Sequence, residues 1–298
     1  MQRHTDPIQQ RLDYLKRSIK AGPGGASAWG RPGGLLAMSL ASAVLQKSRQ
    51  AEGVQAFHKK VLHDLLAGKE NPLASHDKIE WGMWLWSLSV HIEGAKYPRM
   101  PKPIIRYAAP LVESLMQHWR QPEPYWKDSR PVGLHAAHVA AVHAGVAQFD
   151  RWVKVPHVNR FLAESWQVLH ELLQQDEATA DRLWSGIPLD VVNPTDKLLL
   201  ETAGKLEESP DLDLTSRLIL AWYWSGVNAV KQAQNHLQEA LPMLAEPVED
   251  FGVSTIVHQA LAAAAELEFI QAKKRLGIWQ VIPHEHAISK EDDRGIKG

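Results

Sequence analysis

Between Gln121 and Gly145 the chain reads QPEPYWKDSRPVGLHAAHVAAVHAG, which brings a tryptophan, a lysine, an aspartate and three histidines close together. Carboxyl and imidazole groups transfer protons in general acid–base catalysis, and imidazoles also bind zinc. Lys127 and Asp128 stand directly before the alanine-rich helix that carries the histidines. The spacing of these residues decides which of the two chemistries the segment can support.

Histidine spacing argues against a metal centre. His135 and His138 are three residues apart and share a helix face, whereas His143 lies roughly 80° away around the helix. Three histidines so placed cannot form a close ligand set without help from another segment. The segment PHEHAISKEDD near the C-terminus also mixes histidines with carboxylates, but it is polar and terminal, as a flexible tail would be. We therefore expect no metal and no cofactor.

The amino-acid composition indicates a globular protein and argues against nucleic-acid and membrane partners. The chain has 298 residues, of which 45% are apolar, and its 33 basic residues nearly balance its 34 acidic ones. It lacks cysteine, which rules out disulfides and thiol chemistry, and it has no polybasic run that would favour nucleic acid or an anionic membrane. The N-terminal segment MQRHTDPIQQRLDYLKRS has the pattern of an amphipathic helix, and no run approaches 18 apolar residues. We expect a cytoplasmic protein with neutral substrates.

Apolar residues spaced three and four apart predict helices along nearly the whole chain. Ile104, Ala108, Leu111, Leu115 and Trp119, for example, fall on one stripe. Alternating strand patterns are missing, and breakers such as GPGG, YPRMPKP and SGIPLDVVNP are spaced about one helix or one hairpin apart. The pattern predicts one all-helical domain of about twelve helices, built from helix pairs over residues 1–275, with a polar tail at 276–298. The other expected helices span about 6–20, 33–48, 53–67, 77–93, 156–174, 194–207, 213–243 (two helices) and 254–275.

The central segment resembles a known family. PLVESLMQHWRQPEPYWKDSRPVGLHAAHVAAVHAGVAQF is similar to the middle of the glucoamylase and trehalase-like glycoside hydrolases, where an aromatic-ended helix leads to Trp-Glu-Glu and a Gly-x-His helix. The resemblance implies an all-α fold, the (α/α)6 toroid of six helical hairpins, and an oligosaccharide or α-glucoside as ligand. Four further segments resemble the family in the same order: AWGRPGGLLAMSLASAV, HDKIEWGMWLWSLSVHIEGA, WSGIPLDVVNPTDKLLLETAGKLEE and LAEPVEDFGVSTIVHQALAAAAEL.

The resemblance also implies which residues form the site, and it shows what has changed. Inverting glycosidases need one carboxylic acid to protonate the leaving oxygen and one carboxylate to activate water. Lys127 occupies the position of the family's acid, with Asp128 next to it. Glu246 matches the base, with Glu249 or Asp250 as alternatives in the same segment. Arg31 matches the arginine of a sugar clamp, but Pro32 replaces the aspartate beside it. The chain also lacks the family's Tyr/Gly/Trp-rich substrate loop. We therefore expect the acid function to be lost.

Other residues are expected around the same cavity. Asp77 matches a family aspartate, although a helix N-cap explains it about as well. His135 matches the Gly-x-His position, with His138 and His143 as packing residues. Trp29 and Trp126, in loops before helices, are expected to line the cavity, whereas Trp81, Trp84, Trp222 and Trp224 fit core positions of helices.

The sequence is compatible with three functions. The first is a catalytically impaired relative, a pseudoenzyme that binds a saccharide or serves as a subunit. The second is an active inverting α-glycosidase with Glu246 as base and Asp128 or Glu123 as acid. The third is an unrelated helical-repeat scaffold, which an open concave surface would favour. Self-association into a homo-oligomer is also open, and Lys127 also fits an ordinary solvated helix start capped by Asp128 or Ser129.

Overall fold

A computed structural model describes residues 6–21, 32–67, 73, 75–123, 133–175, 178–244 and 253–278. Within these ranges the chain is helical, and its one β-bridge, between Glu123 and Gly133, is isolated rather than part of a sheet. The all-α prediction is confirmed. Its helix boundaries also agree with the spacing of the apolar residues to within a few residues.

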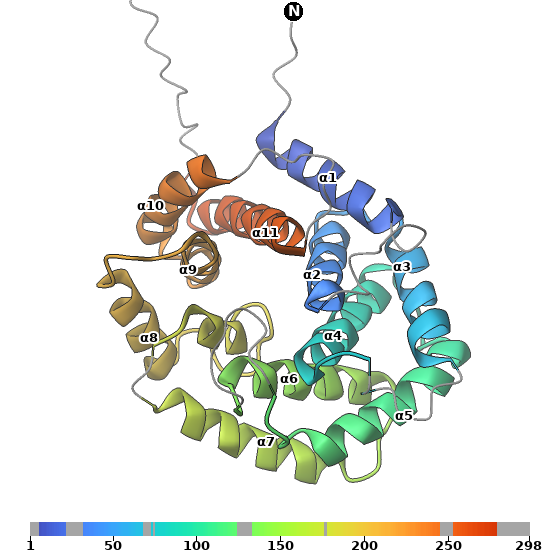
Figure 1. Cartoon of the computed structure of the whole chain (residues 1–298). Helices are drawn as coiled ribbons and strands as arrows, with labels where there is room; N and C mark the ends of the chain where they lie inside the picture. Colours follow the sequence, from blue (N-terminus) through green and yellow to red (C-terminus); the bar gives the residue numbers. More distant parts are fainter. Residues whose placement is uncertain are drawn as a thin grey trace, which may run out of the picture.

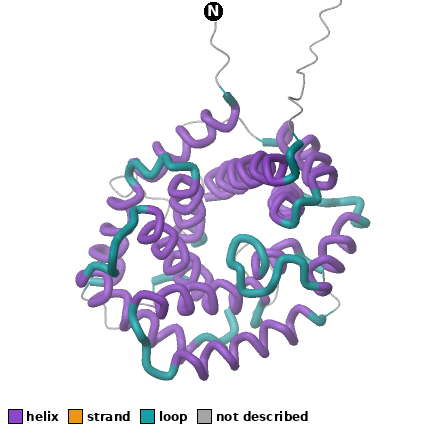
Figure 2. The backbone as a smooth tube through the Cα atoms, turned by 180° about the vertical axis from the view of Figure 1, so that it is seen from behind, coloured by secondary structure: helices purple, strands orange, loops and turns teal. Residues whose placement is uncertain are grey.

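The helices form two concentric layers (Figure 1), and the view from behind shows the same arrangement (Figure 2). Outer elements alternate with inner ones along the chain, so each consecutive pair makes a hairpin. The outer elements are α1 (Pro7–Ala21), α3 (Val54–Lys60) continued by the π-helical η2 (Val61–Leu66), α5 (Lys102–His118), α7 (Val158–Leu173), α8 (Lys197–Glu207) and α10 (Val230–Ala240) with η5 (Leu241–Met243). The inner elements are α2 (Gly34–Lys47), α4 (Lys78–Gly94), α6 (Ala136–Trp152), η4 (Ala180–Ser185), α9 (Leu214–Gly226) and α11 (Val253–Arg275).

The inner layer closes on itself. Each inner element packs against the next, from α2 through α4, α6, η4, α9 and α11, and α11 packs against α2 again. The first helix, α1, also contacts the last, α11, because a guanidinium nitrogen of Arg11 lies 3.3 Å from the carboxylate of Glu266. The ring is therefore a closed toroid, as the family resemblance implied, and not an open solenoid.

The fourth inner position departs from a regular ring of helices. It holds only the 3-10 turn η4, which the sequence patterns did not predict, followed by a loop that leads to α8. Gly186 and Pro188 end the turn, because proline has no amide hydrogen with which to continue a helix. Leu183 and Trp184 are nevertheless fully buried, so this short element still fills its part of the core.

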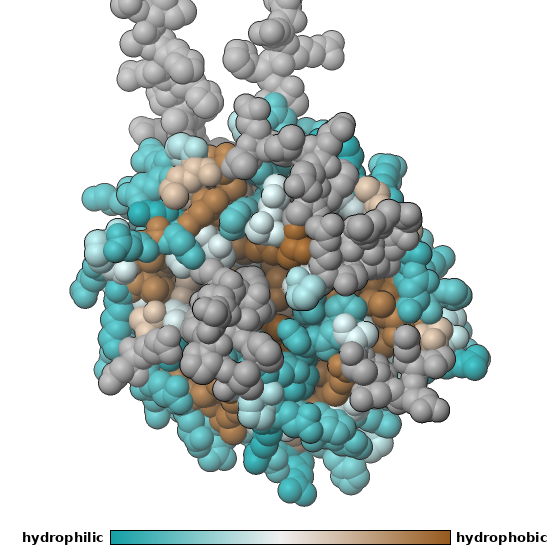
Figure 3. Space-filling model, viewed as in Figure 1, coloured by the Kyte–Doolittle hydropathy of each residue, from teal (hydrophilic) through white to brown (hydrophobic). Residues whose placement is uncertain are grey.

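Inner helices are apolar on almost every side, whereas outer ones such as α5, α7 and α10 have one apolar face. This difference follows from position, because an inner helix is covered both by the outer layer and by the other side of the ring. α11 is the one helix in the described ranges that is long and apolar enough to cross a membrane by length and composition. In the toroid it is an inner helix packed among α1, α2 and α9. In the space-filling view, hydrophobic residues gather toward the centre of the ring and hydrophilic ones surround it (Figure 3).

Two glycines set the distance between α4 and α6. A Cβ added at Gly82 would lie 2.5 Å from the carbonyl carbon of Ala141, and one at Gly145 would lie 2.5 Å from the carbonyl oxygen of Gly82. Both contacts are with backbone, which cannot rotate away as a side chain can. The absence of a side chain at these positions therefore allows the two helices to approach closely.

We predict that Gly82→Ala destabilises the fold by about 1–3 kcal/mol or more, because the helices must separate to admit the methyl group. Gly204→Ala is the matched control, since it also lies within a helix but a Cβ there would meet nothing within 4 Å. The control should be stabilised by about 0.5–1 kcal/mol through better helix propensity. Urea unfolding followed by circular dichroism measures both, and equal effects at the two glycines would contradict the close approach.

Candidate functional site

Three of the nine predicted site residues lie within the described residues, namely Asp77, Glu123 and His135. All three stand where inner helices begin: Asp77 immediately precedes α4 and His135 immediately precedes α6. The other six lie outside the described residues, and they are Trp29, Arg31, Trp126, Lys127, Asp128 and Glu246. Their places around the cavity stay predictions.

A backbone bridge links Glu123 to the start of α6. The Glu123 amide donates to the carbonyl of Gly133 at 3.1 Å, and the Gly133 amide donates back at 3.0 Å. The bridge thus brings together the two residues that flank the segment 124–132, which carries Lys127 and Asp128 in the sequence. His135 follows Gly133 by two residues, so the same bridge links Glu123 to the segment that holds His135.

The carboxylate of Glu123 is bound by Lys78, the first residue of α4. The Lys78 ammonium donates to Oε1 at 2.6 Å and the Lys78 amide donates to Oε2 at 3.0 Å. Both side chains are largely buried, with 6% of Lys78 and 16% of Glu123 exposed. Burial raises the pKa of Glu123, while the bonds to Lys78 oppose the shift. Glu123 therefore satisfies an amide at the N-terminus of a helix in another hairpin.

Glu80 makes the corresponding contact one hairpin further back, and the sequence analysis missed it. Its Oε1 accepts hydrogen bonds from the amides of Leu35 and Leu36 in the first turn of α2, at 3.0 and 3.4 Å. α2 needs this partner because Gly33, at its N-cap position, has no side chain with which to cap it. A single carboxylate in the apolar run KIEWGMWLW was the sequence signal that could have identified it.

Asp77 occupies the N-cap position of α4, yet its side chain makes no capping hydrogen bond. Elsewhere the same residue type does cap: Asp196 accepts from the Leu198 amide at 2.9 Å and Asp213 from the Ser216 amide at 2.7 Å. Burial raises the pKa of Asp77, which is half-buried. The N-cap explanation thus accounts for the position of Asp77 but not for its carboxylate.

Asp77, Glu80 and Glu123 form one group of carboxyls, referred to below as the carboxyl cluster. Burial is the main cause that raises the pKa of Glu80 to about 7, and the charge of Asp77 adds to it. The same Asp77 charge also acts to raise the pKa of Glu123. Lys78 supplies the cation that partly offsets this negative charge. The arrangement offers hydrogen-bond acceptors and one ammonium donor at the end of the toroid where α2 and α4 begin.

His135 and His138 lie at the start of α6, whereas His143, further along this helix, faces the outer helix α7. The ring of His135, half-buried, lies edge-on to the ring of buried His138 with centroids 5.2 Å apart. His143 lies 2.8 Å from the hydroxyl of Ser165 on α7, and burial lowers its pKa to about 4. His143 is thus a packing residue between two helices. No group of three or more metal-ligating side chains that could hold a metal occurs in the described part of the chain.

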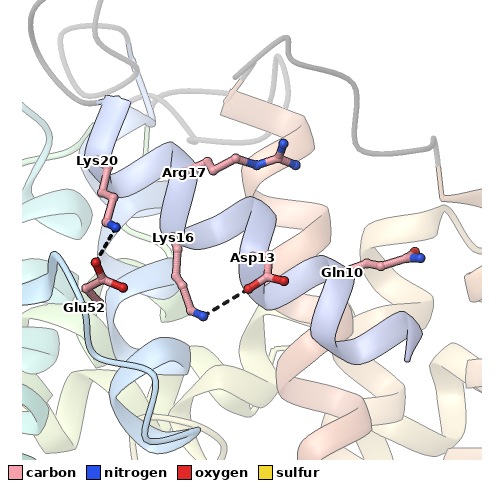
Figure 4. Close-up of a pocket in the computed structure, with 6 residues that line it drawn as sticks. All are labelled: Gln10, Asp13, Lys16, Arg17, Lys20 and Glu52. Carbon is pink, nitrogen blue, oxygen red and sulfur yellow. Dashed lines mark hydrogen bonds and ion pairs between the residues drawn. The ribbon is translucent and has the colours of Figure 1, made fainter. Parts of the chain in front are cut away.

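A hollow of about 640 Å³ lies on the outer surface of α1 (Figure 4). The charged groups in it pair with one another, since Lys16 lies 3.0 Å from Asp13 and Lys20 forms an ion pair with Glu52. The hollow is also open to solvent, where such pairs contribute little. No residue of the carboxyl cluster lines it, and we assign it no role. Its lining residues are Gln10, Asp13, Lys16, Arg17, Lys20 and Glu52.

We predict that Glu80→Gln alters the pH dependence of stability. Because the folded-state pKa of Glu80 is raised, its protonated form favours folding, and this contribution is fully present below pH 4.5 and lost as pH rises through about 7. The shift corresponds to about 3 kcal/mol at about 1.4 kcal/mol per pH unit. The stability of the wild type relative to Glu80→Gln should fall by that order between pH 4.5 and 8 in urea unfolding. A constant difference across this range would contradict the raised pKa.

Comparisons with known proteins agree at the level of the fold. No protein-family model matches the chain, and no curated protein matches it. A solved glycosidase variant in complex with glucose superimposes with a TM-score of 0.63 at 14% identity, covering 89% of this chain and 99% of that chain. A wild-type glycosidase superimposes with a TM-score of 0.60 at 15% identity, covering 92% of this chain and 99% of that one. The chain therefore has a glycosidase-like all-α fold.

Proposed function

We propose that the protein binds a short α-linked saccharide at the end of the toroid where α2, α4 and α6 begin, and that it hydrolyses such saccharides slowly or not at all. The observation that carries the proposal is the carboxyl cluster at this end. Sugar hydroxyls need hydrogen-bond acceptors held in fixed positions. The amide of Lys78 holds the partly exposed carboxylate of Glu123, and the buried Glu80 fixes the start of α2 beside it. The carboxylate of Asp77 is not used by its own helix, so it is available to accept from a sugar hydroxyl.

The fold supports the same choice of ligand. One structural neighbour is a glycosidase with bound glucose, and its chain is covered almost completely by this one. At this identity the likeness shows the fold alone, so the saccharide comes to this chain as a proposal. The scaffold alternative is less well supported, because it called for an open concave surface and the inner elements form a closed ring.

The proposed loss of hydrolysis rests on the sequence. Lys127 stands where the resembled family has its general acid, and a lysine with an ordinary pKa near 10.4 is a poor proton donor at neutral pH. Pro32 cannot replace the carboxylate of the sugar clamp, because its side chain carries no oxygen. Glu246 keeps the position of the base, so the machinery would be incomplete rather than absent.

One observation favours the active alternative. Burial raises the pKa of Glu123, which is the direction that suits a general acid. Against this, both oxygens of Glu123 accept hydrogen bonds from Lys78, and an acid must release its proton toward the leaving oxygen. We therefore assign Glu123 to positioning and propose Asp128 as the remaining acid for any residual activity.

The binding test uses Asp77→Ala, with Asp213→Ala as the control. Asp77→Ala should weaken maltose binding about tenfold or more, since a hydrogen bond to a charged group contributes about 1.5–3 kcal/mol. It should leave stability nearly unchanged because no capping bond is lost, whereas Asp213→Ala should lose about 1 kcal/mol of stability but keep maltose binding. Isothermal titration calorimetry and thermal unfolding measure the two quantities. Equal maltose affinity in wild type and Asp77→Ala would refute the proposed site.

The activity test uses maltose, trehalose and an aryl α-glucoside. We expect the wild type to hydrolyse the disaccharides slowly or undetectably, and the aryl substrate to suffer least, because a good leaving group needs little protonation. Lys127→Glu should restore part of the activity, given that general acid catalysis contributes about 10²–10⁴-fold. Rapid wild-type hydrolysis of either disaccharide, abolished by Glu246→Gln, would establish the active glycosidase instead.

A further inference from the structure

A second, smaller cavity lies between inner helices of the ring and opens to solvent beside the exposed Lys47 and Gln271, away from the carboxyl cluster. Its volume is about 120 Å³, and four inner helices line it: α2, α4, α9 and α11. Lys47 lines it from the last turn of α2, whereas Glu80 contacts the first turn of the same helix. At 1.5 Å per residue these two turns are about 18 Å apart, so the cavity belongs to the opposite end of the toroid.

The apolar side of this cavity includes two indoles. Trp86 of α4 and Trp222 of α9 face it, together with Leu267 and small residues of α2 and α11. Both tryptophans are otherwise buried in the core, with 4% and 5% of their surface exposed, so their rings are fixed in place. A flat, rigid aromatic wall suits the apolar face of a ring-shaped ligand.

The polar side of the cavity carries a hydrogen-bond donor (Lys47), an acceptor (Glu268) and an amide that can do both (Gln271). The Lys47 ammonium lies 5.6 Å from the centroid of Trp86, and Glu268 and Gln271 follow on α11. Arg275 holds the carboxylate of Glu268 at 3.0 Å and is itself fixed by Asn228 at 2.8 Å. The acceptor is thereby held in one position before any ligand arrives.

Charge and size restrict the ligand. Lys47 keeps an exposed surface, yet partial desolvation by the surrounding helices lowers its pKa, and the carboxylates of Glu268 and Asp190 oppose this shift. Both signs of charge are therefore present around the cavity. An anion would meet two carboxylates and a cation would meet an ammonium, which favours a neutral molecule. A cavity needs only about 10–15 Å³ for one water, while drug-sized ligands fill about 300–1,000 Å³. About 120 Å³ therefore fits one small ring and excludes a longer saccharide.

We propose that this cavity is a second binding site that takes a single neutral monosaccharide ring. Its walls are the indoles of Trp86 and Trp222, and its polar groups are those of Lys47, Glu268 and Gln271. The indoles would cover one face of the sugar, and the three polar side chains would bond its hydroxyls. The site lies at the end of the toroid opposite the carboxyl cluster, and it does not depend on the proposed function there. Glucose bound here would leave the first end free.

The test is equilibrium dialysis of the whole protein against glucose, with four variants. Lys47→Met and Gln271→Leu each remove one polar group and shorten the side chain by only one atom, and each should weaken one class of glucose site at least tenfold. Lys274→Met is the matched control, because this lysine lies exposed on α11 and does not line the cavity. Asp77→Ala should leave the Lys47-sensitive class unchanged. Far-ultraviolet circular dichroism checks that every variant is folded.

The two proposals fail in different ways. If the cavity takes no sugar, glucose binding in Lys47→Met and Gln271→Leu will equal that of the wild type, which overturns this inference and leaves the carboxyl cluster unaffected. If only the carboxyl cluster is inactive, glucose binding will depend on Lys47 and not on Asp77. Displacement of glucose by acetate, or a loss in Lys274→Met as large as that in Lys47→Met, would also overturn the monosaccharide site.

Discussion

The first turns of the inner helices α2 and α4 depend on carboxylates that come from neighbouring hairpins. The first amides of any α-helix have no partner within the helix, and burying them without one is costly. Glu80 of α4 supplies the acceptor for α2, and Glu123, which precedes α6, supplies the acceptor for α4. The second and third hairpins are thereby each tied to the one before, at the same end of the ring. These two contacts align the starts of α2 and α4 with the hairpins that follow them.

A polar surface arises from the same contacts. Capping carboxylates must lie where helices begin, so the positions that stabilise the fold also collect negative charge at one end of the ring. Asp77 adds a third carboxyl that its helix does not use, and its charge contributes to the raised pKa of Glu80. A saccharide-binding surface therefore needs little beyond what the helix termini already require.

Sequence reasoning predicted the helices because their signal is local, and it missed contacts that join distant residues. A stripe such as Ile104, Leu111 and Leu115 reports burial of one helix face within a few turns. Glu80 and its partner Leu35 are 45 residues apart, and no periodicity connects them. The short element η4 was also missed. Gly186 and Pro188 are residues typical of a loop, and only the tertiary packing buries Trp184 beside them. Asp77 and His135 were placed through resemblance, and the structure locates both directly before inner helices.

The direction of the inner helices gives the two ends of the toroid different electrostatic characters. Each inner element follows an outer one, so the inner helices all run the same way along the axis, and their dipoles add. Helix N-termini favour negative groups and C-termini favour positive ones. The carboxyl cluster stands at the first end, while Lys47 ends α2 and Lys273, Lys274 and Arg275 end α11 at the other. An acceptor-rich end and a donor-rich end are thus consequences of the topology.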